Sequence, residues 1–192
     1  MTTNKLLQVY GTQLLFADHA TDFGAAPATA ANSLIIGTPT DVQMNMSTIA
    51  DGAAWQSAKT GSIADVASAF PIDMMLGACM ESTATPAAGV TFDFYWNASP
   101  SATAGTGNSG GCSGADAAYT AAGESQLIFI GSLVCVANVI NIDANIGILR
   151  LPHLYGSLVV YNNTGVAMVA DANADQIHCT LTPLIPDIQA AA

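Results

Sequence analysis

The sequence predicts an all-β fold, an antiparallel β-sandwich that is jelly-roll-like, with long loops and little helix. Three observations support this: apolar and polar residues alternate in several short segments, short apolar runs lie between them, and turn residues recur at short intervals. Alternation with a period of two is typical of a strand with one buried face. Roughly eight to ten strands at this spacing are typical of a sandwich or a barrel. We expect a single domain over residues 1–192, because a chain of this length can bury its own core.

The alternating segments predict strands with one buried face. They are Val42–Ser47, Val90–Asn97, Ile140–Asp143 and Ile177–Thr182. In the second segment Phe92, Phe94 and Trp96 point to one side, so we assign them to the core. His178 lies on the polar side of the last segment, and we expect it to be an exposed or interface side chain.

Continuous apolar runs predict strands that are covered on both faces. Leu127–Ile130 with Leu133–Val136, and Leu158–Tyr161, are short enough to be such strands, and we expect them to lie centrally in a sheet. By composition, Ile72–Met80 fits either a strand or a turn of helix. Gly77 and the alternation of its apolar residues favour a strand.

Turn residues separate these segments. They occur at Gly37–Pro39, Asp51–Gly52, Thr60–Ser62, Pro86–Gly89 and Asn162–Gly165. Helix candidates are limited to Ile63–Ala69 and Ala115–Ala122, and both are short.

Residues 97–122 form a long Gly/Ser/Ala-rich connection with no core-forming periodicity before Tyr119. A connection of this length inside a domain is normally functional or disordered. Two interpretations remain open: a flexible solvent loop, or an arm that contacts another subunit and becomes ordered on assembly. The two tails, Met1–Thr12 and Pro183–Ala192, could be extended and have the same role, because neither carries the charge typical of a solvated tail.

The charge of the chain excludes several classes of partner. The chain has fourteen acidic residues and only three basic ones, Lys5, Lys59 and Arg150, so its formal net charge is -11. Three scattered cations cannot form a phosphate-binding patch, so we expect no nucleic-acid partner and no anionic membrane surface. Charged residues make up only 9% of the chain, which suits a surface in close contact with neighbouring proteins. The negative charge either maintains solubility or matches a basic partner.

The sequence predicts synthesis and folding in a reducing cytoplasm. Gln8, Tyr10 and Gly11 interrupt the first apolar run before it could form the core of a signal peptide. No segment approaches the roughly 20 apolar residues of a membrane span. The cysteines are far apart without a CxxC pair, so we expect free thiols, most of them buried: Cys79, Cys112, Cys135 and Cys179.

No pattern of residues indicates catalysis. His19, His153 and His178 are the only imidazoles, no Gly-x-Ser-x-Gly elbow surrounds a serine, and no second His follows any of them closely. Asp171–Asp175 offers oxygen atoms at alternating positions but lacks the Gly and Glu of an EF-hand, so we interpret it as a polar turn. Gly105–Gly111 is glycine-rich but lacks the Lys and the βαβ context of a phosphate loop. We therefore expect no enzymatic activity, no cofactor, and no catalytic, cofactor-binding or metal-binding residue.

The block Phe92–Asn108, FDFYWNASPSATAGTGN, resembles small virion proteins encoded among the structural genes of tailed bacteriophages. In these proteins a strand ending in Tyr-Trp continues into a Ser-Pro-Ser loop, a Gly-Asn turn and the sequence GADAAY, here Gly114–Tyr119. Phe129–Val134, Tyr155–Val160 and Thr182–Ile185 resemble later parts of the same proteins, so the similarity covers roughly residues 90–189.

The resemblance implies a capsid decoration, or cement, protein. Such a protein is a β-sandwich subunit, here expected as a homotrimer, that binds the major capsid protein on the outer surface of the head and stabilises the shell across capsomer junctions. The resemblance carries no catalytic residues. We expect Trp55 and Tyr95 to lie on contact surfaces, because flat amphipathic rings are enriched in interface anchors.

Two alternatives remain open. The first is a carbohydrate-binding head fibre or adhesin, for which Trp55, Tyr95 and Asp93 would form the centre of the site. The second is a neck or tail ring component, which would assemble with sixfold symmetry.

Overall fold

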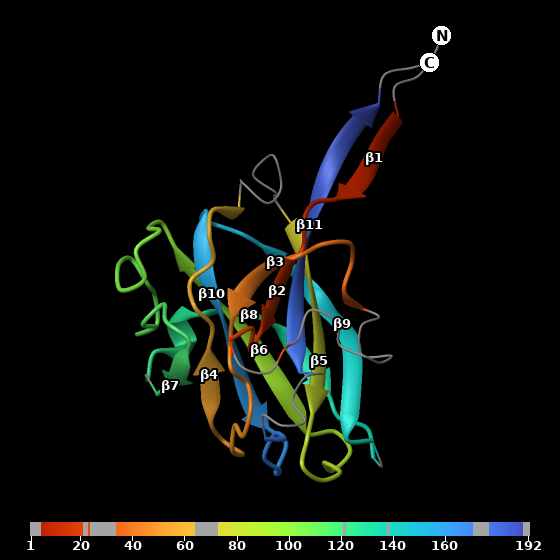
Figure 1. The fold of residues 1–192 in the computed structure, drawn as a ribbon, viewed down its shortest axis with the longest axis vertical. Helices are drawn as coiled ribbons and strands as arrows, with labels where there is room; N and C mark the ends of the chain where they lie inside the picture. The colour runs from red at the N-terminus through yellow and green to blue at the C-terminus, as the bar shows by residue number, and fades with distance from the viewer. Residues whose placement is uncertain are drawn as a thin grey trace.

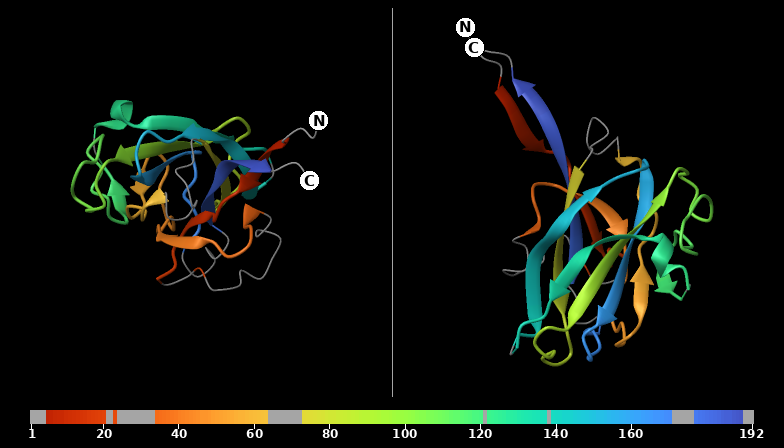
Figure 2. Two further views of the ribbon diagram at one scale, coloured as in Figure 1. Left: turned by 90° about the horizontal axis from the view of Figure 1, so that it is seen from above. Right: turned by 180° about the vertical axis from the view of Figure 1, so that it is seen from behind.

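The computed structural model describes residues 5–20, 23, 34–63, 73–120, 122–137, 139–170 and 177–189. It confirms the all-β prediction: two sheets pack face to face around one core (Figures 1 and 2). The first half of the chain forms β1 (Lys5–Tyr10), β2 (Leu14–Ala17), β3 (Thr40–Gln43), β4 (Ala54–Gln56), β5 (Asp73–Glu81) and β6 (Thr91–Ser99). The second half forms β7 (Ala117–Tyr119), a 3-10 turn (Glu124–Gln126), β8 (Ile128–Val134), β9 (Asn141–Arg150), β10 (Tyr155–Asn163) and β11 (His178–Gln189).

The strand order is that of a jelly roll. One sheet has the order β3-β2-β11-β5-β9, with β1 also paired to β11, and the other has the order β7-β4-β10-β6-β8. The chain changes sheet repeatedly, so that β2, the first strand of the sandwich body, pairs with β11, the last. The pairs are antiparallel except β2 with β3, which are parallel.

The core lies between the two sheets, and alternation along β6 correctly predicts its central aromatic residues. Phe92, Phe94 and Trp96 are fully buried, and they pack with Met74 and Leu76 of β5 in one apolar cluster. Burying side chains of this size stabilises the fold by about 1.5–3 kcal/mol each relative to leaving them exposed.

The prediction for His178 is wrong, because both faces of the first half of β11 are covered. His178, Thr180 and Thr182 are buried like the apolar residues between them. Phe23 packs on His178 with ring centroids 5.6 Å apart, and Gln13 Nε2 donates a 2.8 Å hydrogen bond to Thr182 Oγ1. The polar residues of this part of β11 are thus covered by other parts of the chain rather than exposed to solvent.

The positions of two other predicted strands also differ. β8 contains most of the run from Leu127 to Val136, but it is the edge strand of its sheet rather than a central one, and Phe129 and Val134 are more than half exposed. The strand expected at Val42–Ser47 ends at Gln43, although Met44 and Met46 still enter the core. β10, which contains Leu158–Tyr161, is central as predicted.

Neither helix candidate is confirmed. Within Ala115–Ala122, residues Ala117–Tyr119 form strand β7, which pairs with β4, so the helix prediction there is wrong. The rest of Ile63–Ala69 after Ile63, and Ile72 at the predicted start of β5, lie outside the described residues.

The segments Lys5–Tyr10 and Leu184–Gln189 form a two-stranded ribbon. β11 continues past its pairing with β5, which ends at Leu184, and its last six residues pair with β1. Figures 1 and 2 show the ribbon projecting from the body of the sandwich.

Candidate interaction surfaces

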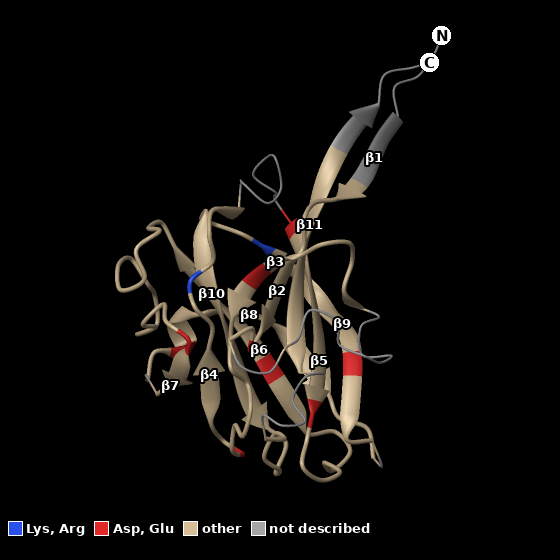
Figure 3. Cartoon of the chain, in the orientation of Figure 1, with Lys and Arg blue, Asp and Glu red and all other residues tan. Residues whose placement is uncertain are grey.

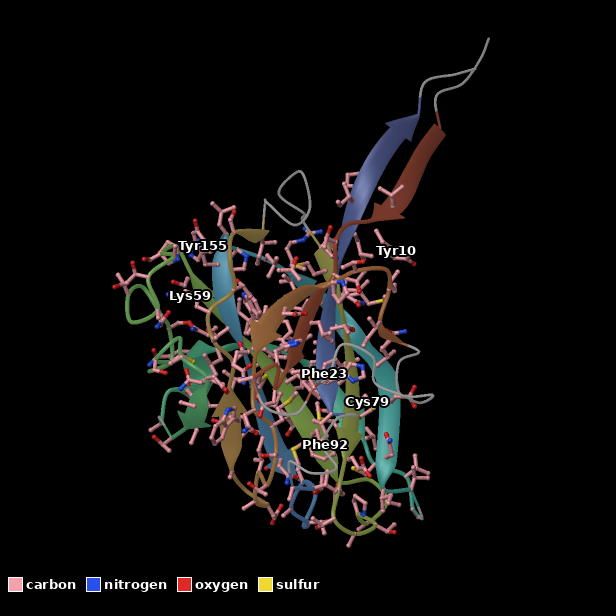
Figure 4. The ribbon with its side chains drawn as sticks, viewed as in Figure 1. Tyr10, Phe23, Lys59, Cys79, Phe92 and Tyr155 are labelled. Atoms are coloured by element: carbon pink, nitrogen blue, oxygen red, sulfur yellow. The ribbon has the colours of Figure 1, made fainter. Side chains whose placement is uncertain are left out.

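Lys59 fixes the start of the long loop after β6. Its Nζ atom donates to Ser99 Oγ at 2.9 Å and to the carbonyl oxygens of Ser101, Thr103 and Thr106 at 3.1, 2.7 and 2.8 Å. An ammonium group has three protons, so these four acceptors share them. Burial lowers the pKa of Lys59. Figure 4 labels Lys59 beside this loop.

The rest of the loop is bonded to the same domain. Asn97 Oδ1 accepts hydrogen bonds from the backbone N–H and the hydroxyl of Ser109, at 2.8 and 2.9 Å. Tyr119 donates to the Gly110 carbonyl at 2.6 Å, and the Ser113 N–H donates to Gln56 Oε1 at 2.8 Å. These hydrogen bonds connect the described part of the loop, residues 97–120, to its own domain.

Trp55 lies on β4, between β10 and the edge strand β7. Its Nε1 atom donates a 2.6 Å hydrogen bond to Asp116 Oδ1, and the ring is half-buried beside a hollow of about 400 Å³. Trp55 pairs with Val160, and Val160 pairs with Phe94, so these side chains point to the inner side of the sheet.

Tyr95 and Asp93 lie on the outer side of the same sheet. Tyr95 donates a 2.7 Å hydrogen bond to Glu124 Oε1, and its ring packs edge-on against Phe129 with centroids 5.2 Å apart. Tyr95, Glu124 and Phe129 line a shallow hollow of about 510 Å³, together with Ser125. Burial and the neighbouring Glu124 raise the pKa of Tyr95. Asp93 and Tyr95 share this side of the sheet, whereas Trp55 faces the other, so the three residues do not form one group.

The edges of β8 and β9 carry the main exposed apolar surface of the described body, which we term the β8–β9 edge. Its most exposed members are Phe129 (55%), Val134 (54%), Val136 (59%), Ile140 (45%) and Ile148 (63%). The segment from Leu127 to Ile142 contains no charged residue. Figure 3 shows how sparsely charged residues occur along the described chain.

Two glycines bring these edge strands close together. A Cβ atom at Gly131 would lie 2.9 Å from Ile146 Cγ2, and one at Gly147 would lie 3.1 Å from the Ile130 carbonyl oxygen. β8 and β9 belong to different sheets and run beside each other at one side of the sandwich (Figure 2). The β8–β9 edge is therefore one continuous surface built from both sheets. Its exposure could not be read from the apolar run alone, because such a run is equally compatible with a central strand.

Among the described residues, the histidines and acids do not converge on a metal site. His19 Nδ1 lies 3.6 Å from Asp41 Oδ2, His153 is exposed in a turn, and His178 is buried. Across the described ranges, no group of three His, Cys, Asp or Glu side chains could hold a metal ion. The predicted polar turn Asp171–Asp175 lies outside these ranges.

The prediction of free, buried thiols is confirmed. All four cysteines are buried and unbridged: Cys79, Cys112, Cys135 and Cys179. Burial raises the pKa of both Cys79 and Cys112 to about 12, with nearby Asp143 and Glu81 contributing at Cys79. These thiols remain protonated at neutral pH and act as small apolar side chains.

A search for membrane-spanning helices among the described residues found none of sufficient length and hydrophobicity. Comparisons of the chain with family models, with curated proteins and with solved structures found no match. Inference about function therefore rests on the residues and surfaces described above.

Proposed function

We propose that this chain is a capsid decoration (cement) protein of a tailed bacteriophage. It binds the major capsid protein on the outer surface of the head as a homotrimer and stabilises the shell across capsomer junctions. The resemblance of residues 90–189 to such virion proteins suggested this function. The observation that carries it is the β8–β9 edge, an exposed apolar surface on a jelly-roll body.

The β8–β9 edge has the properties of a protein-binding surface. Exposed apolar patches that span two strands mark interaction sites on soluble domains. A stable interface takes about 800 Å² from each partner, which requires a surface that continues beyond one strand. The fixed loop held by Lys59 and the half-buried Trp55 add rigid surface, so binding requires little ordering of the chain.

The net charge of -11 favours a partner with a basic rim. Electrostatic complementarity increases the rate and specificity of association rather than its intrinsic affinity. We therefore expect salt to slow the binding of the protein to shells, while apolar contacts at the β8–β9 edge maintain the bound state.

The direct test is rebinding of the purified protein to heads of its own phage that have been stripped of it. We expect light scattering to give a mass made up of whole trimers, whether single or joined in pairs, together with saturable binding and a higher temperature of head rupture. Ile148→Asp places a charge in the β8–β9 edge and should weaken binding at least tenfold. Ile36→Asp is the matched control, because Ile36 is 45% exposed and precedes β3, at the opposite edge of its sheet from β9.

Several results would contradict the proposal. One is failure of the trimeric protein to bind stripped heads. Another is equal affinity of the Ile148→Asp and Ile36→Asp variants for these heads. A hexameric ring without affinity for heads would instead favour the neck or tail component.

A second candidate is carbohydrate binding at the hollow beside Tyr95. Phe129 offers an exposed ring, and Glu124, Ser125 and Tyr95 offer polar atoms around it. A glycan array with wild-type protein and a Phe129→Ala variant tests this function. Uniformly empty arrays would remove it, whereas a signal lost in the variant would support it.

A further inference from the structure

The two edges of the β1/β11 ribbon differ in their ability to pair with another strand. Outside the body, β11 pairs only with β1, and no described strand pairs with the other edge of β1. An isolated two-stranded ribbon is only marginally stable in water. A ribbon of this kind gains stability when a further strand adds to one of its edges.

The register fixes which backbone groups face outward. The Gly11 N–H donates to the Pro183 carbonyl at 3.0 Å, which makes Tyr10 and Leu184 a non-hydrogen-bonded pair. Because pairs alternate along an antiparallel ladder, the next non-hydrogen-bonded pairs are Gln8 with Pro186 and Leu6 with Ile188. In such pairs the N–H and C=O groups of both residues point away from the partner strand.

Pro186 therefore blocks the outer edge of β11. Proline has no N–H, so position 186 cannot donate a hydrogen bond outward. The outward groups of Leu184 already pair with β5. Beyond Leu184, Ile188 is therefore the only residue of this edge with an outward N–H. Proline on an edge strand is a common guard against unwanted strand addition. Pro186 costs the ribbon no internal hydrogen bond, because its missing N–H would have pointed outward.

The outer edge of β1 has no such guard. Leu6, Gln8 and Tyr10 each present an outward N–H and C=O, and β1 contains no proline and no acidic residue. In the body, β3 covers the corresponding edge of β2, and the Thr40 N–H donates to the Gln13 carbonyl at 2.7 Å. The row of backbone groups that β3 covers on β2 therefore continues along β1, where no described strand pairs with it.

We propose that the open edge of β1 binds β1 of a second copy of this chain. The two strands pair antiparallel about a twofold axis at Gln8, which gives a four-stranded sheet in the order β11-β1-β1-β11. Leu6 then pairs with Tyr10 of the second copy, Gln8 with Gln8, and Tyr10 with Leu6. The three outward residues are symmetric about Gln8, so both strands offer the complementary pattern that a twofold interface requires.

The charge distribution favours a second copy at this site. Two bodies of net charge -11 repel each other, whereas β1 carries a single charge, that of Lys5, and no acid. A ribbon of six residues extends about 20 Å, beyond the roughly 8 Å over which salt screens charges. Pairing through the ribbons thus joins two copies while keeping the acidic bodies apart.

This contact is separate from shell binding and does not depend on it. A twofold pair cannot close a ring of three, so any trimer formed elsewhere on the molecule would be joined to another trimer through β1. We therefore expect the mass in solution to be an even multiple of the chain mass: two chains if β1 pairing is the only contact, and six if it joins two trimers.

Proline variants test the two edges separately. Gln8→Pro removes an outward N–H from β1, and Ile188→Pro removes an outward N–H from β11; neither removes a hydrogen bond within the ribbon. We expect Gln8→Pro to halve the mass measured by light scattering and Ile188→Pro to leave it unchanged. A wild-type mass that is an odd multiple, an unchanged mass for Gln8→Pro, or equal losses in both variants would overturn the proposal.

Cysteine cross-linking tests the register. Residues of a hydrogen-bonded pair have Cα atoms about 5.5 Å apart, within the range for a disulfide. Gln8→Cys should therefore form a covalent dimer on mild oxidation. Leu6→Cys alone should not, because the two copies of residue 6 would lie about 13 Å apart along the strands. The native cysteines are buried and give little background. Efficient cross-linking through Leu6→Cys, or none through Gln8→Cys, would rule out this pairing.

Discussion

The indole ring of Trp96 lies against Gly156 of the neighbouring strand, so that a Cβ atom at position 156 would overlap Cζ2 and Cε2 of the ring. Trp96 itself pairs with Leu158, two residues further along β10, and is fully buried. The large Trp96 ring thus occupies the space that a side chain at position 156 would fill.

Gly156→Ala should therefore destabilise the fold by about 1–3 kcal/mol, because the added methyl group overpacks the core. Urea unfolding measures the loss. Gly61→Ala is the control, since a Cβ atom there meets nothing within 4 Å. Combining Gly156→Ala with Trp96→Leu should cost less than the sum of the two changes. A full additive cost would show that the ring and residue 156 do not compete for space.

Lys59→Met should loosen the loop from Ser99 to Thr106, because three carbonyls and one hydroxyl lose their shared ammonium group. We expect a loss on the order of 1–2 kcal/mol and faster amide exchange in the loop. Arg150→Met is the matched control: its side chain is 75% exposed and bonds only Asp73 among the described residues. Unchanged exchange in Lys59→Met would contradict the role of Lys59 in fixing the loop.

Asp116→Ala should destabilise the region around Trp55. The carboxylate accepts hydrogen bonds from Trp55 Nε1, the Asn45 N–H and Gln43 Nε2, at 2.6, 2.9 and 3.2 Å. We expect a loss of about 1–3 kcal/mol and a red shift of tryptophan fluorescence as water reaches Trp55. Asp51→Ala, which removes one exposed hydrogen bond to Gly165, should have a smaller effect and no spectral shift.

The buried thiols should be unreactive in the folded protein. Burial raises the pKa of Cys112 from the ordinary 9.0 to about 12, so the reactive thiolate is scarce at neutral pH. A chromogenic disulfide reagent should label the native protein slowly and all four cysteines after unfolding. Rapid labelling of the folded protein would contradict their burial.

The same pKa shifts predict a loss of stability in alkali. Because the folded-state pKa of Cys79 and Cys112 is raised, their contribution to stability is present below about pH 9 and is lost as pH rises through about 12. Burial raises the pKa of Tyr95 and Tyr161 as well, which adds to the effect in the same direction. The urea midpoint should fall above about pH 9, and Cys112→Ala should reduce that fall.

Local periodicity predicted much of the sandwich but not which faces other segments cover. Phe92, Phe94 and Trp96 alternate with polar residues, and the structure buries them as expected. His178 follows the same pattern, yet Phe23, which is distant in sequence, covers it. Such coverage depends on contacts between remote segments, which alternation within one strand does not encode.

The surfaces were less predictable than the core. Trp55 and Tyr95 are partly exposed, but they lie on opposite sides of one sheet because of the register of β4 with β10. The apolar run at β8 gave no sign of an edge position, since strand order is set by long-range pairing. Asn97 and Ser109 in the loop are of residue types that commonly form hydrogen bonds with the backbone in turns. Their presence was the sequence feature that could have indicated hydrogen bonding within the loop.

The pairing of Lys5 with Gln189 places the two outermost described residues of the ribbon side by side. A protein fused before Lys5 and one fused after Gln189 would therefore both be attached at the tip of the ribbon, away from the sandwich body (Figure 1). A short peptide could also join these two positions, and new ends could be opened at the Pro86–Gly89 turn between β5 and β6. The ribbon is thus a suitable place for circular permutation, which would join its two paired strand ends in a closed hairpin.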